Sequence, residues 1–94
     1  FHNPKDMAVS ISIEAAELLE HFQWKNAAQC EAHVKANRET VADEVADVAI
    51  YLFELADLMD LDLGEVMLRK LRKNAAKYPV GKSRGSNKKY DALG

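Results

Sequence analysis

The chain has 94 residues, of which 48% are hydrophobic and only 4 are glycine and 2 proline. This length suits one domain, and the abundance of helix-forming residues predicts an all-α fold. No run of about 18 apolar residues is present and the start lacks the build of a secretory signal, so a soluble protein without membrane spans is expected. The single cysteine, Cys30, excludes an intrachain disulfide and a cysteine-based zinc site, and favours the cytoplasm.

The charge is unevenly distributed along the chain. Residues 1–68 carry 14 acidic and 4 basic side chains, whereas residues 69–94 carry 1 acidic and 9 basic ones. The two halves either neutralise one another on a solvated surface or form an acidic cation site beside a basic segment that receives phosphate. Nucleic-acid binding is disfavoured, because the acidic part would repel a phosphate backbone and no recognition motif is present.

Two helices are expected before residue 36. Asn3 is a suitable N-cap for a helix that runs to about Gln23. Its apolar positions follow the spacing of a buried stripe: Ala8, Ile11, Ala15, Leu18 and Phe22. Asn26 and Gln29 form a capping-box pattern that opens a short second helix, which continues to about Lys35.

The strongest helical pattern covers residues 38–60. Its apolar residues keep an unbroken 4-3-4-3-4 spacing: Val41, Val45, Val48, Leu52, Leu55 and Met59. A second apolar row widens this face: Ala42, Ala49, Phe53 and Ala56. A helix with such a wide apolar face contacts neighbours on more than one side, which predicts a bundle and a subunit interface.

A fourth helix is expected to begin after Asp62, which with Glu65 forms another capping-box pattern, and to end near Lys77 or Tyr78. Its buried side should be formed by Val66, Met67, Leu68, Leu71, Ala75 and Tyr78. Residues 79–94 have no periodicity and are rich in Gly, Ser, Asn and Lys, so they are interpreted as an extended or mobile basic tail behind a helical domain of residues 1–78.

Two acidic pairs carry the chemistry that the sequence indicates. Glu14 and Glu17 lie on the first helix, and Glu44 and Asp47 on the third, each pair spaced i, i+3 and so on one side of its helix. Each pair begins inside an apolar stripe, where a carboxylate is costly unless it is coordinated or paired. If the two helices pack antiparallel, four carboxylates converge, and Mg²⁺ or Mn²⁺ is the expected ligand.

Alternatives remain for these acidic pairs. A single i, i+3 acidic pair is most often a solvated helix surface. A di-iron bundle would need Glu-x-x-His, and no histidine follows an acidic residue at that spacing. The Asp60–Gly64 stretch resembles part of a Ca²⁺ loop, but its downstream acidic residue is not at the required position, so both metal alternatives are discarded.

Candidate substrate-binding residues surround these pairs in the sequence. Lys70, Asn74 and Lys77 share one face of the fourth helix and could bind phosphate oxygens, although a basic surface helix gives the same pattern. Trp24 directly follows the first helix and is either a lid on the core or a stacking surface for a nucleobase. Tyr51 lies one turn after the second acidic pair, within reach of a phosphate or sugar oxygen.

An ordered set of motifs resembles the MazG-like family of nucleotide pyrophosphohydrolases, particularly its short dCTP pyrophosphatase-like members, over roughly residues 1–80. The motifs are Phe1-His2-Asn3-Pro4, Glu14-x-x-Glu17, Phe22-Gln23-Trp24, Glu44-x-x-Asp47 followed by Tyr51, and Asn74-x-x-Lys77-Tyr78-Pro79. The resemblance implies an α-helical protomer that pairs through its long helices as a dimer or a tetramer of two dimers. It also implies cleavage of nucleoside triphosphates between the α and β phosphates as a house-cleaning activity.

The same resemblance implies a role for individual residues. Glu14, Glu17, Glu44 and Asp47 would be Mg²⁺ ligands. Tyr51, Asn74, Lys77 and Tyr78 would contact phosphate or sugar, and His2 and Trp24 would help to enclose the base. Two rivals are a related enzyme acting on dUTP or phosphoribosyl-ATP, and a non-catalytic helical oligomerisation or nucleotide-binding regulatory module. The second rival requires no Mg²⁺ and forms no product.

Overall fold

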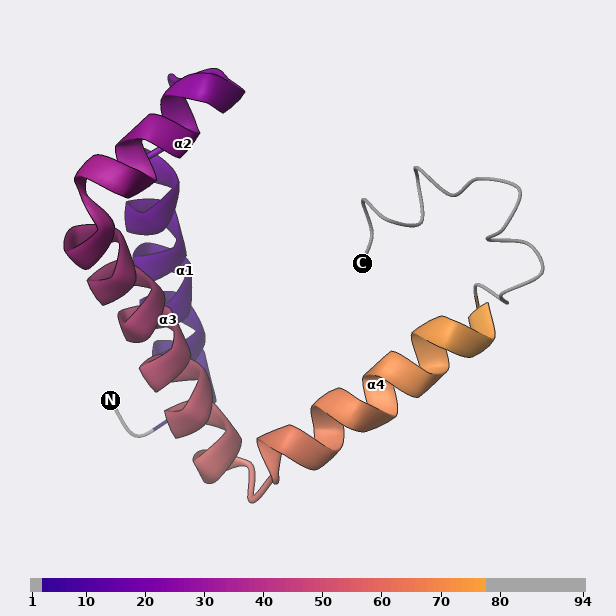
Figure 1. Cartoon of the computed structure of the whole chain (residues 1–94). Helices are drawn as coiled ribbons and strands as arrows, with labels where there is room; N and C mark the ends of the chain where they lie inside the picture. The colour runs from indigo at the N-terminus through magenta and orange to yellow at the C-terminus, as the bar shows by residue number, and fades with distance from the viewer. Residues whose placement is uncertain (1–2, 78–94) are drawn as a thin grey trace. The chain divides into compact units, whose positions relative to one another are not determined.

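A computed structural model of the chain describes residues 3–77 (Figure 1). This part of the chain folds into helices without any strand: α1 (Pro4–Glu20), α2 (Ala27–Ala36), α3 (Arg38–Leu58) and α4 (Leu63–Lys77). The all-α prediction with four helices is therefore confirmed. His2, Tyr78 and the predicted tail 79–94 lie outside the described residues.

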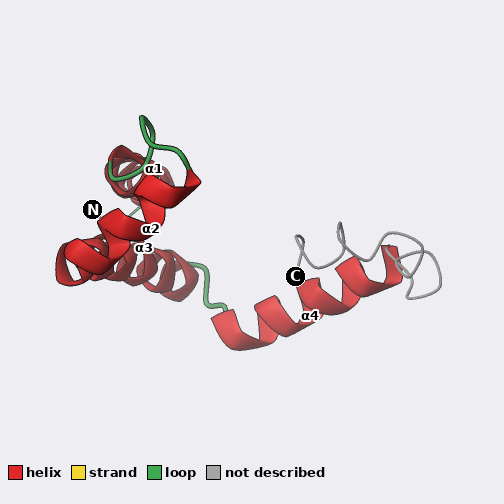
Figure 2. Cartoon of the chain, turned by 45° about the horizontal axis from the view of Figure 1, so that its top comes forward, coloured by secondary structure: helices red, strands yellow, loops and turns green. Residues whose placement is uncertain are grey.

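The first three helices form one unit. α1 and α3 lie side by side and run in opposite directions, and α2 crosses at the end where α1 finishes and α3 begins (Figures 1 and 2). This is the antiparallel packing on which the convergence of the two acidic pairs depends. The contacts divide the chain into Phe1–Leu61 and Asp62–Gly94, which are described separately. The division into residues 1–78 and 79–94 stays a prediction.

Side-chain caps determine where α1 and α2 begin. Asn3 accepts a hydrogen bond from the Asp6 backbone N–H at 2.8 Å, and proline follows it at the first helical position. Asn26 and Gln29 form both bonds of the predicted capping box, each 2.9 Å long. Each cap satisfies N–H groups that have no partner inside the helix. These starts agree with the sequence prediction.

The end of α1 differs from the prediction. The helix ends at Glu20, three residues before Gln23, and the chain continues in a tight turn. In this turn the Phe22 and Gln23 N–H groups both bond to the Leu19 carbonyl. The turn lets the His21 and Phe22 rings meet the His33 ring on α2, with centroids 5.0 and 6.0 Å from it.

The core of the described chain is small. Among its hydrophobic residues only Met7, Val41 and Ala56 are buried, and Met7 is 1% exposed. The predicted stripes are only partly buried: Ile11, Leu18, Val48 and Leu55 are half-buried. Several of their members are exposed instead: Ala8, Ala15, Val45, Leu52, Phe53 and Met59. Periodicity identifies an apolar face, but it does not tell whether this chain alone covers it.

The apolar side of α4 is also exposed, against the prediction. Met67, Leu68 and Leu71 are 54–61% exposed, and only Leu63 and Val66 are half-buried within this helix. The Asp62 side chain accepts a hydrogen bond from the Glu65 N–H at 3.1 Å, which is the first half of the predicted capping box. In the described part of the chain no helix is long and apolar enough to cross a membrane. The cytoplasmic location stays a prediction.

The end of α3 is a Schellman motif. The Leu61 N–H bonds to the Ala56 carbonyl at 2.8 Å and the Asp60 N–H to the Asp57 carbonyl at 3.1 Å. Asp60 has φ = 55°, in the left-handed region that glycine adopts without steric cost. Asp60, which has a Cβ atom, therefore adopts this conformation at a cost in free energy.

Substitution of Asp60 by glycine is expected to raise the free energy of unfolding by about 0.5–1 kcal/mol, because glycine removes this penalty. Chemical denaturation measures the effect. Asp57→Gly, inside α3, is the matched control and should lower stability by about 1 kcal/mol. Equal destabilisation by both variants would contradict the interpretation of the turn.

Candidate functional site

The antiparallel pair of helices brings three of the four predicted carboxylates together. One oxygen each from Glu14 and Glu17 on α1 and from Glu44 on α3 lie within 4.8 Å of one another. We call these three residues the acidic cluster. Three carboxylates at this separation repel one another when all are ionised. The arrangement is therefore unfavourable unless protons or a cation neutralise it.

Two oxygens of the acidic cluster have no hydrogen-bond donor among the described residues. They are Oε2 of Glu14 and Oε2 of Glu44, and both atoms are buried although their residues are half-buried. A buried carboxylate oxygen without a donor costs free energy. These two atoms are thus available to a ligand that supplies positive charge.

The proximity of the carboxylates raises pKa values within the acidic cluster. A hydrogen bond to the Glu17 side chain, desolvation and neighbouring negative charges raise the pKa of Glu14 from 4.5 to about 7. Desolvation, followed by the negative charges of Glu17 and Asp47, raises the pKa of Glu44. Both shifts favour the protonated form in the absence of a cation.

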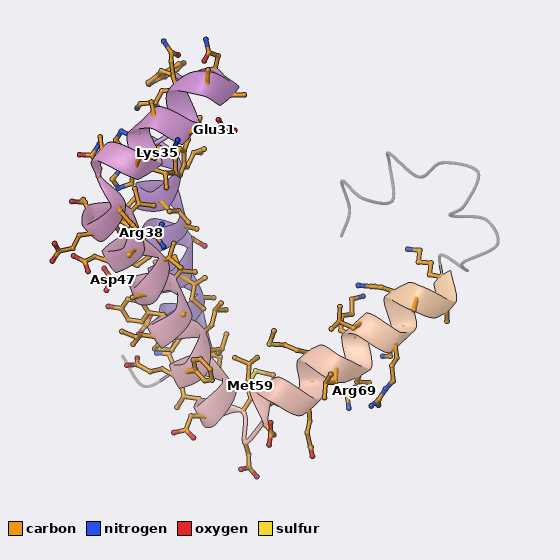
Figure 3. All side chains as sticks on the ribbon, in the orientation of Figure 1. Glu31, Lys35, Arg38, Asp47, Met59 and Arg69 are labelled. Carbon is orange, nitrogen blue, oxygen red and sulfur yellow. The ribbon has the colours of Figure 1, made fainter. Side chains whose placement is uncertain are left out.

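Asp47 lies close to the acidic cluster but does not belong to it. It is exposed on α3 (Figure 3), and its negative charge contributes to the raised pKa of both Glu14 and Glu44. The position next to the acidic cluster is compatible with a fourth ligand. Its predicted role as a ligand stays a prediction.

A hollow of about 490 Å³ opens next to the acidic cluster. It is lined by residues from the end of α1, the following turn, α2 and the start of α3: Glu17, Glu20, His21, Lys25, His33, Thr40 and Glu44. Glu17 and Glu44 belong to both features, so a ligand in the hollow could reach an ion held by the acidic cluster. The sequence predicted no role for four of these residues: His21, Lys25, His33 and Thr40.

Lys25 and the two histidines give this hollow its basic side. His21 Nδ1 lies 2.8 Å from His33 Nε2, which joins the end of α1 to α2. Desolvation and the positive charges of Lys25 and His21 lower the pKa of His33. Cys30 packs below the same turn as a half-buried thiol, 3.9 Å from the Lys25 carbonyl oxygen.

The remaining predicted contacts are dispersed. Trp24 is 87% exposed, which contradicts the interpretation as a lid on the core of this chain. Tyr51 is half-buried on α3, one turn beyond Asp47. Lys70, Asn74 and Lys77 lie on α4, in the second unit of the chain.

The acidic cluster fits a hard divalent cation. Mg²⁺ and Mn²⁺ prefer oxygen ligands, and a few carboxylates with several waters and substrate phosphates complete their shells. The acidic cluster offers carboxylate oxygens alone, two of them buried and without donors. Glu14, Glu17 and Glu44 could therefore hold such an ion, with Asp47 beside them.

Binding of Mg²⁺ should tighten by about tenfold between pH 6 and pH 8, because Glu14, with a pKa of about 7, must lose its proton to become a ligand. Calorimetric titration at both pH values measures this, and Glu14→Gln should flatten the dependence. Without metal, Glu14 keeps its proton in the folded chain above pH 4.5, where the unfolded chain has lost it. Its contribution to stability is therefore lost as the pH rises from about 4.5 through 7. Binding of Mg²⁺ that does not change with pH would contradict this account.

An antiparallel helical scaffold that brings carboxylates of two helices together is typical of the all-α proteins that bind metal ions through carboxylates. Residues 9–93 match the model of the MazG-like family, and the chain belongs to this family.

Named relatives refine the comparison. The chain is 38% identical over 95 residues to dCTP pyrophosphatase 1 of Rattus norvegicus and 36% identical over 95 residues to dCTP pyrophosphatase 1 of Homo sapiens. Each alignment covers 99% of this chain but 56% of the relative, so the chain spans little more than half the length of these relatives.

A solved structure supports the fold. The chain resembles a pyrophosphatase from Archaeoglobus fulgidus with a TM-score of 0.80 and 46% sequence identity, over 83% of this chain and 73% of the other. This similarity and the family match confirm the resemblance that the ordered motifs indicated.

Proposed function

We propose that the chain catalyses the Mg²⁺-dependent hydrolysis of nucleoside or deoxynucleoside triphosphates to a nucleoside monophosphate and pyrophosphate, and so removes surplus nucleotides. One observation carries the proposal: three carboxylates from two helices lie within 4.8 Å, and two of their buried oxygens lack a donor among the described residues. Without a cation this arrangement costs free energy, because the carboxylates repel one another and two buried oxygens lack donors. A cation bound there would remove this cost and could hold a polyphosphate beside it. The names of the relatives and of the archaeal structure support the same reaction.

In this proposal the carboxylates have different roles. Glu14, Glu17 and Glu44 bind the ion, and Asp47 completes the acidic side of the site. Bound Mg²⁺, or Mn²⁺ in its place, would neutralise triphosphate charge and activate water for attack on the α phosphate. Glu17 and Glu44 both belong to the acidic cluster and line the hollow, and we assign to Glu17 the role of orienting the attacking water and accepting its proton.

The other predicted residues would bind the nucleotide. Trp24 is exposed and offers an apolar face on which a base can stack, and Tyr51 could bond a sugar or phosphate oxygen. Lys70, Asn74 and Lys77 would bind phosphate oxygens from α4. His2 would help to enclose the base, and Tyr78 would contact phosphate or sugar.

We also propose that the active protein is a homo-oligomer, a dimer or a tetramer of two dimers. The exposed apolar side chains on α1 and α3 support this, among them Ile13, Val45, Ile50 and Phe53, each about half exposed or more. Large apolar side chains exposed along two packed helices are what a surface covered by a second copy would have.

A substrate panel tests the reaction. The chain is incubated with ribo- and deoxyribonucleoside triphosphates, dCTP and dUTP included, and the products are separated by ion-exchange chromatography. A monophosphate and pyrophosphate in equal amounts support cleavage between the α and β phosphates, whereas a diphosphate and inorganic phosphate would contradict it. The ranking of substrates also separates the proposal from an enzyme dedicated to dUTP or phosphoribosyl-ATP.

The second candidate is a non-catalytic oligomerisation or nucleotide-binding module. The exposed apolar faces favour association, but they leave the buried, donorless carboxylate oxygens unexplained. Such a module would bind a nucleotide without Mg²⁺ and release no product.

A further inference from the structure

A chain of hydrogen bonds runs from Asn37 through His33 to His21, and both histidines line the hollow. The Asn37 amide nitrogen Nδ2 lies 3.1 Å from the His33 backbone carbonyl oxygen and 3.2 Å from His33 Nδ1. A carbonyl oxygen only accepts, so the atom of Asn37 facing it must be the amide nitrogen and not the amide oxygen. The second hydrogen of this NH₂ group is then available to His33 Nδ1.

The tautomers of both histidines follow from this orientation. If His33 Nδ1 accepts a hydrogen bond from Asn37, a neutral His33 carries its proton on Nε2. His33 Nε2 then donates to His21 Nδ1 at 2.8 Å, and a neutral His21 must carry its own proton on Nε2. The chain of bonds therefore ends in an N–H donor on His21.

The surroundings agree with a neutral His33. Desolvation, Lys25 and His21 lower the pKa of His33, which disfavours a second proton on that ring. Asn37 and the His33 ring thereby determine which nitrogen of a neutral His21 carries the proton. No hydrogen bond joins His21 Nε2 to another described residue.

The place of this donor indicates its partner. His21 and Lys25 line the hollow together with Glu17 and Glu44, the two members of the acidic cluster that face it. At about 490 Å³ the hollow is in the range of small-molecule pockets. The acidic residues of the lining, which include Glu20, would repel a phosphate without a cation. A phosphate bound to a divalent cation suits this lining, because the cation offsets the acidic side chains while His21 and Lys25 donate to the phosphate oxygens.

We infer that His21, held as the Nε2–H tautomer by His33 and Asn37, donates to a phosphate oxygen of the metal-bound substrate or of the pyrophosphate product, beside Lys25. The inference rests on the proposed function and assigns phosphate binding to the end of α1, in addition to the predicted basic residues of α4. His21 and Lys25 are binding residues here, and His33 and Asn37 are positioning residues.

Nuclear magnetic resonance tests the tautomers without any substrate. Long-range ¹H–¹⁵N correlation of the intact chain at pH 7.5 should show the proton on Nε2 of both His21 and His33. Asn37→Ala, which removes the amide donor, should convert the His33 signal toward a mixture of tautomers. A wild-type His21 with its proton on Nδ1 would overturn the inference.

Calorimetric titration with inorganic pyrophosphate in Mg²⁺ tests the binding role. His21→Leu and Lys25→Gln should each weaken binding by about tenfold, whereas His21→Gln, which keeps a side-chain N–H donor, should retain most of it. Lys35→Gln is the matched control, because Lys35 is exposed on α2 outside the hollow (Figure 3). Omission of Mg²⁺ should abolish binding in the wild type.

The outcomes separate the inference from the proposed reaction. If the wild type releases pyrophosphate from nucleotides but His21→Leu keeps its KM and its affinity for pyrophosphate, the inference is overturned and the reaction stands. If pyrophosphate binding depends on His21 but no nucleotide is hydrolysed, the reaction is overturned and the phosphate site stands.

Discussion

Glu44→Gln is expected to lower pyrophosphate release at least about 100-fold. The amide keeps the size of the side chain but removes the negative charge of Glu44, which is the one member of the acidic cluster on α3. Steady-state rates at saturating Mg²⁺ measure the loss. The metal-free variant should be as stable as the wild type or more stable, because one repelling charge is gone.

Asp43→Asn is the control for this substitution. Asp43 is the neighbouring acidic residue on α3, is exposed and is not part of the acidic cluster. It should change the rate by less than about twofold. Equal rates for wild type and Glu44→Gln would show that Glu44 does not take part in the reaction. An equal loss of rate in Glu44→Gln and Asp43→Asn would show that the rate depends on the total negative charge of α3 and not on Glu44 in particular.

Met7→Ala is expected to lower the free energy of unfolding by about 2–4 kcal/mol, the largest effect on stability foreseen for this chain. Met7 is 1% exposed and is the largest fully buried side chain among the described residues. Truncation leaves a cavity in a core that otherwise buries only Val41 and Ala56. Urea denaturation at fixed protein concentration measures the change.

Met7→Leu is the volume-conserving control and should cost less than about 1.5 kcal/mol. A loss below about 0.5 kcal/mol for Met7→Ala would mean that the side chain is not packed as described. A similar loss for both variants would show that the site depends on the thioether and not on volume.

The helices could be predicted well because their starts depend on local chemistry. Asn3, Asn26 and Asp62 cap helices within three residues of themselves, so a short sequence window contains the information. The end of α1 could not be predicted in the same way. It depends on the packing of His21 and Phe22 against His33, which lies 11 or 12 residues further along the chain.

Burial was the less predictable property. The spacing of Val41, Val45 and Phe53 identifies the apolar faces of α3, yet only Val41 is buried in the described chain. A single sequence does not distinguish an apolar residue that packs within its own chain from one that a second copy would cover. The predicted apolar side of α4 has the same ambiguity.

The acidic cluster could be predicted because two facts coincide in the sequence. Glu14 and Glu44 interrupt apolar stripes, and each has a second acidic residue one turn away. The phosphate side of the hollow had no such signal. His33 and Asn37 lie one turn apart at the end of α2, but His21 meets His33 only through the placement of α2 against the end of α1, which spacing along one helix cannot reveal.

The position of the cation is the central claim. Crystals of the chain grown with Mn²⁺ and a non-hydrolysable nucleoside triphosphate would show it by anomalous scattering. The account predicts a peak between Glu14, Glu17 and Glu44, with Asp47 beside it and the phosphates extending into the hollow next to His21. A fully occupied Mn²⁺ site elsewhere, with no peak at the acidic cluster, would contradict it.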